Sequence, residues 1–205
     1  MKFFLVRHGE TEWNKLGRFQ GHYDISLNER GVSQAKETAE TAAAWGHCAI
    51  YSSPLIRTMQ VAEELARVTP MLVTKEPGLM ELSLGDLEGV TGHEMREEWP
   101  LVFAQWRSNP EKISMPNGES LVQLRERTWQ TILDIEQKHT SEEVITIISH
   151  NFAIRCIVGE LLGQPLEFFH RMSLNLSSVC TFESDDRGRR LTGYNSIAHL
   201  STENR

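Results

Sequence analysis

The chain carries two histidines that each follow an apolar run, a position from which an imidazole can act as a nucleophile or bind a metal ion. His8 closely follows Lys2–Val6, and His150 closely follows Val144–Ile148. Short runs of aromatic and β-branched residues are typical of buried strands. Since ligands of open parallel sheets bind beyond the carboxyl ends of the strands, both histidines are predicted to lie at one sheet edge.

Positive charge is predicted at the same edge. Arg7 directly precedes the first histidine, and Arg57 falls in the first turn of a helix predicted after a third short strand, Cys48–Tyr51. The free N–H groups and the dipole of a helix N-terminus favour an anion, and Asn151 begins a further helix. Because the whole chain has a net charge of −7, this edge would be a local site for an anion such as a phosphoryl group.

A metal site and a nucleotide-binding fold are the competing interpretations, and both are disfavoured. The chain has no H-E-x-x-H pair, and Arg7 beside His8 would repel a divalent cation. No G-x-G-x-x-G motif follows a predicted strand, and no G-x-x-x-x-G-K-[ST] motif occurs. We therefore expect neither a bound metal ion nor a cofactor.

The elements that must position these residues are strand-then-helix units, which argue for an α/β fold with a mostly parallel sheet. Helix start signals are Asn28, with a possible capping box from Ser26 to Glu29, and Ser53 as an N-cap with Pro54 at the first helical position. Three more elements are predicted from periodicity: a helix from Leu121 to Ile135, and late strands at Val179–Glu183 and Leu191–Ile197 that form a hairpin.

The segment between Glu81 and the helix at Leu121 is irregular and rich in glycine and proline. Its large apolar residues are spaced like a cap helix that packs inward: Met95, Trp99, Phe103 and Trp106. Residues 82–117 hold six acidic and three basic residues, a net charge of −3. This segment is predicted to lie over the sheet edge as a small cap.

Length and composition restrict the class of protein. At 205 residues the chain is expected to form a single domain, residues 1–205. No apolar run is long enough for a bilayer and no secretory signal is evident, so a cytoplasmic protein is expected. The acidic balance predicts no binding to nucleic acid or membrane, and oligomeric state is not indicated. Three widely spaced cysteines, Cys48, Cys156 and Cys180, are expected to be buried thiols.

Leu5–Asn14 (LVRHGETEWN) and later motifs together resemble the histidine phosphatase superfamily, the phosphoglycerate mutase-like fold. The further segments follow in the family's order: Gly17–Gly21, Leu27–Ala35, Tyr51–Thr58, Leu79–Gly89, Pro116–Ser120 and Val144–His150. They extend from residue 2 to about 160. The resemblance implies a three-layer α/β/α sandwich with a mostly parallel central sheet and a small cap inserted at about 82–117.

The resemblance also implies roles for five residues. His8 is the implied nucleophile, phosphorylated transiently, and Glu81 is the implied proton donor. Arg7, Arg57 and His150 are implied to surround the phosphoryl group. General chemistry agrees: imidazole attacks through an unprotonated nitrogen, so the other ring N–H of His8 needs an acceptor, which we expect to be a backbone carbonyl. Two arginines would supply the charge that magnesium supplies elsewhere.

Further residues are expected near the substrate or away from it. Asn14 and Gln20 match family positions that contact phosphate. Gly21 and Asn151 are also expected to bind substrate, although the family usually has glycine at the position of Asn151, after the histidine that matches His150. Three arginines are expected on solvated helix faces: Arg125, Arg127 and Arg155. Three other histidines are expected at the surface, with lining of the pocket as the alternative: His22, His93 and His170.

The resemblance implies hydrolysis of phosphate monoesters of small metabolites, without metal, through phosphohistidine. A phosphoglycerate mutase is the main alternative. However, a mutase must hold a phosphorylated intermediate in a basic, water-poor pocket, which an acidic cap does not favour. A non-catalytic phosphate-binding or scaffold protein is the second alternative, but such members usually lack a catalytic residue. We therefore predict a phosphatase similar to the short members of the family.

Overall fold

The computed structural model describes residues 1–205 and contains one six-stranded sheet in the order β3-β2-β4-β1-β5-β6. Strands β1 to β4 run parallel, and β5 and β6 run antiparallel at one edge. Their bounds are Lys2–Arg7, Ala49–Ser52, Val73–Lys75, Val144–Ser149, Val179–Asp185 and Gly188–Ser196. The prediction of a mostly parallel α/β sheet is confirmed.

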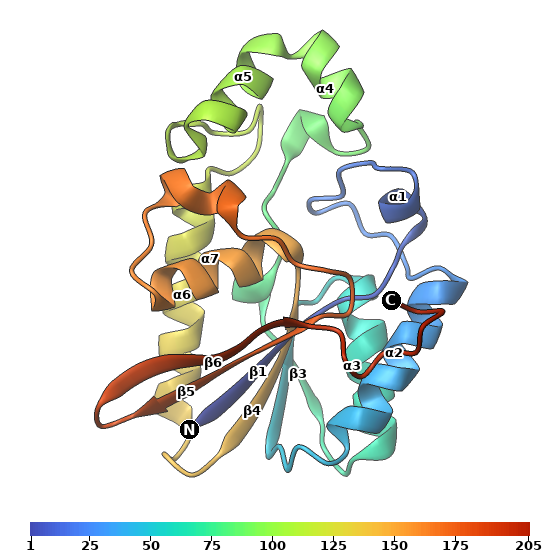
Figure 1. The fold of residues 1–205 in the computed structure, drawn as a ribbon, viewed down its shortest axis with the longest axis vertical. Helices are drawn as coiled ribbons and strands as arrows, with labels where there is room; N and C mark the ends of the chain where they lie inside the picture. The colour runs from blue at the N-terminus through green and yellow to red at the C-terminus, as the bar shows by residue number, and fades with distance from the viewer.

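Helices cover both faces of the sheet (Figure 1). Helices α2 and α3 cover one face, whereas α6 and α7 cover the other. Alternation along β1 explains the two cores, because Phe3 and Leu5 face α6 and α7 while Phe4 and Val6 face α2 and α3. The helix bounds are Glu12–Lys15 (α1), Glu29–Ala42 (α2), Ile56–Val68 (α3), Gly92–Glu98 (α4), Pro100–Ser108 (α5), Leu121–Lys138 (α6) and Asn151–Leu161 (α7).

The segment predicted to be a cap lies beyond the carboxyl ends of the parallel strands (Figure 1). It contains α4, α5 and two short 3₁₀ turns, η2 (Gly85–Leu87) and η3 (Pro110–Lys112). Met95 and Trp106 are buried in its apolar core, against which Trp99 and Phe103 pack. This core continues into α6 and α7 through Leu121 and Ala153, so the cap is anchored to the sandwich by side-chain packing.

Three local predictions about helix starts and strand ends were wrong. Ser53 is not an N-cap: α3 begins at Ile56 with Leu55 in the N-cap position, because the Ser53 amide still bonds to Ile148 of β4. No capping box forms from Ser26, since Asn28 itself accepts from the amide of Gly31. The hairpin strands run on to Asp185 and begin again at Gly188, so the turn is shorter than predicted.

Two further features differ from the prediction. Cys48 is exposed, not buried, because it precedes β2 and its thiol donates to the Val144 carbonyl at the beginning of β4. Cys156 and Cys180 are buried free thiols, as predicted. Strand β3 was not predicted, since its three residues carry no distinctive pattern. None of the helices has the length and apolar character needed to span a membrane.

Candidate active site

His8 lies directly beyond β1, where the backbone fixes it on both sides. Its amide donates to the Ser149 carbonyl at 3.1 Å, and its carbonyl accepts from the Ser177 amide at 3.1 Å. The ring Nδ1 is 2.7 Å from the Gly9 carbonyl. A carbonyl only accepts, so Nδ1 carries the proton and Nε2 has the free lone pair. This is the arrangement that a nucleophilic imidazole needs.

The surroundings of His8 keep it uncharged. Burial, together with the neighbouring charges of Arg57 and Arg7, holds the pKa of His8 well below its usual value. The residue is 3% exposed. The imidazole is therefore neutral at physiological pH and available to attack.

Arg7 and Arg57 supply positive charge beside this histidine. Burial lowers the pKa of each to about 10, which leaves both charged at neutral pH. Arg7 donates to the Leu174 carbonyl, and its Nε is buried without a partner in the protein. Arg57 donates to the carbonyls of Tyr23 at 2.9 Å and Gly21 at 2.7 Å. Each terminal nitrogen of Arg57 retains a second N–H for a ligand.

His150 is the N-terminal cap residue of α7 and lies against Arg57. The Nε of Arg57 is 3.3 Å from Nδ1 of His150, and Nε2 of His150 is 2.8 Å from the Ser53 hydroxyl. An arginine N–H only donates, so Nδ1 accepts and Nε2 donates to Ser53. Burial and the positive charge of Arg57 hold the pKa of His150 well below its usual value. Neutral His150 therefore fixes Arg57, and it lies behind the lining of the cleft.

Glu81 reaches the site from an irregular segment between η1 (Pro77–Leu79) and η2. Its carboxylate meets the N-terminus of α7, where Oε1 accepts from the amides of Phe152 and Ala153 at 3.1 Å each. The Leu82 amide also donates to Oε1 at 3.0 Å, whereas Oε2 shares only the amide of Phe152. Oε2 is therefore the oxygen with room for a proton. The N-terminus of α7, which was predicted to favour a bound anion, thus binds the side chain of Glu81.

These groups line one small cleft of about 90 Å³ under the cap. Drug-sized ligands occupy pockets of roughly 300–1,000 Å³, so this cleft suits a phosphoryl group with a small substituent. Its lining is Arg7, His8, Asn14, Arg18, Phe19, Gln20, Gly21, Arg57, Glu81, Leu84, Asn151 and Phe152. Eight of the nine residues predicted for the site therefore line one cleft, and His150 lies directly behind it.

The predicted substrate-binding residues differ in what they offer. The Asn14 oxygen accepts from Thr11 in the capping box of α1, which leaves its NH₂ group as a donor. Side-chain oxygens of Gln20 and Asn151 are buried without a partner in the protein, and because an amide oxygen only accepts, each would need an N–H or O–H donor on a ligand. Gly21 has φ of +53°, in the left-handed region, and an added Cβ would lie 2.3 Å from Oε1 of Glu88, so glycine is favoured there.

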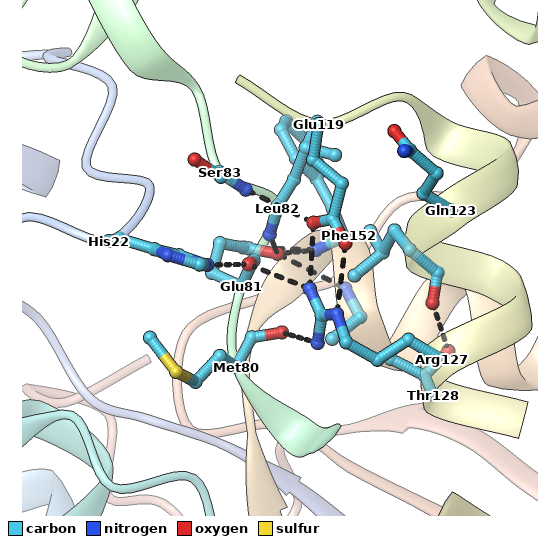
Figure 2. A network of polar contacts seen from close by, with 12 residues as sticks. His22, Met80, Glu81, Leu82, Ser83, Glu119, Gln123, Arg127, Thr128 and Phe152 are labelled. Atoms are coloured by element: carbon cyan, nitrogen blue, oxygen red, sulfur yellow. Dashed lines mark hydrogen bonds and ion pairs between the residues drawn. The ribbon is translucent and has the colours of Figure 1, made fainter. Parts of the chain in front are cut away.

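Two of the arginines expected in solvent make their contacts within the protein instead. Arg155 is 7% exposed because α7 is covered by the sheet and cap, and its guanidinium lies 3.8 Å from the centroid of the Phe169 ring. Arg127 donates to the backbone around Glu81, where His22 also donates to the Glu81 carbonyl at 2.8 Å (Figure 2). The surface prediction was thus wrong for Arg155 and incomplete for two partly exposed residues: Arg127, whose side chain is 25% exposed, and His22, which is half-buried.

The other surface predictions agree with the structure. Arg125 is partly exposed and pairs with Glu160, and His93 is exposed on α4. His170 is exposed and its Nε2 lies 2.7 Å from the Trp106 carbonyl. None of the three lines the cleft.

The sequence analysis also missed four residues that line the cleft: Arg18, Phe19, Leu84 and Phe152. Arg18 lies at the mouth with a side chain 38% exposed, and it donates to the Gly89 carbonyl. Arg18 and Phe19 fall inside the Gly17–Gly21 motif and could have been found there. Leu84 and Phe152 carried no chemical signal.

Comparisons with known proteins agree with this geometry. The family model described as Histidine phosphatase superfamily (branch 1) matches residues 3–197. Phosphoserine phosphatase 1 of Hydrogenobacter thermophilus is 33% identical over 98% of this chain and 94% of its own length. A probable phosphoglycerate mutase GpmB of Escherichia fergusonii is 33% identical over 87% of this chain and 83% of its own.

A solved structure gives the same result for the fold. A mutant phosphoserine phosphatase from Entamoeba histolytica, in complex with phosphoserine, superposes with a TM-score of 0.87 at 29% identity, covering 98% of this chain and 99% of that one. The predicted three-layer fold and family resemblance are both confirmed. The chain belongs to the histidine phosphatase superfamily.

Proposed function

We propose that this chain hydrolyses phosphate monoesters of small carboxylic acids through a phosphohistidine at His8. The observation that carries the proposal is the tautomer of His8, whose Nδ1 donates to Gly9 while Nε2 stays free beside the positive charges of Arg57 and Arg7. A neutral nucleophile beside fixed positive charge matches the needs of phosphoryl transfer, because the transferred group carries its charge on its outer oxygens.

In the first step, Nε2 of His8 attacks the phosphorus atom and the bond to the ester oxygen breaks. Arg7 and Arg57 hold the phosphoryl oxygens, and Asn14 donates its free NH₂ group. Glu81 gives its proton from Oε2 to the departing alkoxide. The products of this step are phosphohistidine, a free alcohol and the Glu81 carboxylate.

In the second step, water attacks the phosphorus atom and the P–N bond breaks. The Glu81 carboxylate takes a proton from that water, which restores its acid form. Inorganic phosphate leaves, and His8 returns to its neutral state with Nδ1 donating to Gly9. His150 acts through Arg57, which it holds in place from behind the cleft.

Hydrolysis is favoured over transfer to a second phosphoglycerate. The cap carries six acidic and three basic residues, and two of the acids, Glu88 and Glu94, line a second hollow that shares Arg18 with the cleft. A bisphosphate intermediate would be repelled by these carboxylates. A non-catalytic role is disfavoured because the nucleophile, both arginines and the acid are all present around one cleft.

Arg18 supports a substrate with a carboxylate close to its phosphate. Its guanidinium lies at the mouth, 3.6 Å from Glu94, and lines the cleft together with His8. A guanidinium binds a carboxylate through paired N–H donors. Two similar proteins carry names that refer to such acids, phosphoserine and phosphoglycerate.

The cysteines support a cytoplasmic location for the protein, because disulfides are rare in that compartment and Cys48, Cys156 and Cys180 are all free thiols.

The proposal is tested by phosphate release from phosphoserine, 3-phosphoglycerate and p-nitrophenyl phosphate, with isomerisation of 3-phosphoglycerate measured in parallel. Phosphate release from the acids, unaffected by EDTA, is the expected result because arginines provide the charge. Isomerisation faster than hydrolysis would favour the mutase. Activity abolished by EDTA and restored by magnesium would refute the proposed mechanism.

A further inference from the structure

Glu81 depends for its position on a side chain far from it in sequence, Arg127 of α6. The backbone from Met80 to Leu84 belongs to no helix or strand, so regular hydrogen bonding does not fix it. A backbone carbonyl inside a protein must nevertheless be paired. The pairing here comes from Arg127 and His22, whose donors meet at the Glu81 carbonyl (Figure 2).

Arg127 uses all of its donors for this purpose. Its NH1 donates to the carbonyls of Gly78 at 3.0 Å and Met80 at 2.9 Å. Its NH2 donates to the Glu81 carbonyl at 3.2 Å and to Glu119 at 2.7 Å, and its Nε donates to Glu119 at 2.9 Å. Guanidinium has five N–H groups, and each has a partner here. A lysine could not reproduce this planar set.

Glu119 completes the network and ties it to the cap. Its Oε1 accepts from Nε of Arg127 and its Oε2 from NH2, and Oε2 also accepts from the Ser83 amide at 3.3 Å. In return, the Glu119 amide donates to the Ser83 carbonyl at 2.9 Å. The side chains of Arg127 and Glu119 are 25% and 16% exposed, so the pair is largely shielded from solvent. The segment from Gly78 to Ser83 is thereby fixed at both ends.

We propose that Arg127, held by Glu119, is a positioning residue for the general acid Glu81. This inference rests on the proposed function, because it concerns the proton that Glu81 gives to the leaving group. The carboxylate is aligned by the amides of α7, but these can only hold it if the Glu81 backbone stays at the right distance. Arg127 fixes that distance through the carbonyls of Met80 and of Glu81 itself.

The test compares two leaving groups in the first step. An alkoxide leaving group needs the proton of Glu81, whereas p-nitrophenolate needs it little. In Arg127→Lys, single-turnover phosphorylation of His8 by phosphoserine should slow by roughly 10- to 100-fold, since small misplacements of catalytic groups have effects of this size. Phosphorylation by p-nitrophenyl phosphate should slow by less than about 3-fold.

A double-mutant comparison separates positioning from general damage. In a Glu81→Gln background, adding Arg127→Lys should change the phosphoserine rate by less than about 3-fold, because no proton remains to be positioned. Arg125→Lys is the matched control on the same helix and should leave both rates unchanged. Glu119→Gln should reproduce the leaving-group dependence more weakly, and it replaces Arg127→Lys if that variant does not fold.

The outcomes distinguish this inference from the function on which it rests. If the wild-type protein forms phosphohistidine and Arg127→Lys slows both substrates equally, the proposed function stands and the positioning role is refuted. Additive effects of Glu81→Gln and Arg127→Lys would refute it as well. If the wild-type protein forms no phosphohistidine with either substrate, both the function and the inference fail.

Discussion

The floor of the cleft, formed by His8, Arg57 and Asn151, and the cap above it differ in the kind of backbone that positions their side chains. His8, Arg57 and Asn151 stand at the end of β1, at the start of α3 and at the start of α7, so regular elements place them. The cap, residues 82–117, instead consists of short helices and turns on an apolar core around Met95 and Trp106. The floor therefore suits chemistry that all substrates share, whereas the cap and mouth suit discrimination between substrates.

This difference explains what the sequence could predict. His8 and His150 were placed correctly at one edge because each follows a clear strand pattern, and parallel strands end together. Glu81 follows no such pattern, and only the family resemblance singled it out. Its position depends on Arg127, which is 46 residues away in sequence, and no local periodicity indicates such a contact.

The same reasoning accounts for the errors. The sequence pattern around an arginine on the polar face of a helix is the same whether its guanidinium is solvated or bound to backbone carbonyls. Arg127 was therefore expected in solvent. Cys48 was expected inside because it adjoins an apolar run, but burial along β2 starts only at Ile50. Both errors concern which neighbour covers a side chain, which is decided by tertiary packing.

The largest effect is expected from the floor. His8→Gln keeps a polar side chain of similar size but removes the nucleophile, so turnover should fall by at least about 10⁴-fold for every substrate. Initial-rate assays with phosphoserine and p-nitrophenyl phosphate measure this loss. A variant that retains most of its activity on either substrate would contradict the assignment of His8.

A smaller loss, again independent of the substrate, is expected for Arg57→Ala. Removing one group that stabilises developing charge typically slows an enzyme by about 10²- to 10³-fold. The values of kcat/KM for the two substrates should fall in parallel, because the proposed mechanism places Arg57 against the phosphoryl group that they share. A loss confined to one substrate would show that Arg57 distinguishes between substrates. It would then contradict the assignment of the shared chemistry to the floor and of substrate selection to the cap and mouth.

Arg18→Gln tests the mouth of the cleft, where the expected loss depends on the substrate. Losing a charged hydrogen bond at a partly exposed site should lower kcat/KM for phosphoserine by about 10-fold. The value for p-nitrophenyl phosphate, which has no carboxylate, should stay within about 2-fold of wild type. Arg96→Gln, an exposed arginine of α4, is the control and should affect neither substrate. Equal losses for both substrates would show that Arg18 binds the phosphoryl group.

The smallest effect concerns stability. Burial holds the pKa values of His8 and His150 below their usual range, so below pH of about 6.5 the unfolded chain binds protons that the folded chain does not. The free energy of unfolding should therefore decrease as pH falls through that value. Each histidine contributes up to ~1.4 kcal/mol per pH unit. Urea titrations at several pH values between 7 and 5 give the free energy of unfolding at each pH. This free energy should depend less steeply on pH in His8→Gln than in the wild type, and an unchanged pH dependence would contradict a buried, neutral His8.

The central claim is that the free Nε2 of His8 becomes phosphorylated, and one measurement tests it most directly. Wild-type protein is mixed with phosphoserine, quenched in base within milliseconds and digested, and the modified peptide is identified by mass spectrometry and phosphorus NMR. The expected result is an acid-labile, base-stable phosphoryl group on Nε2 of His8, formed and lost at rates compatible with turnover. A phosphoryl group on Nδ1, on another residue, or on none at all would contradict the account, because Nδ1 donates to Gly9 and only Nε2 is free to attack.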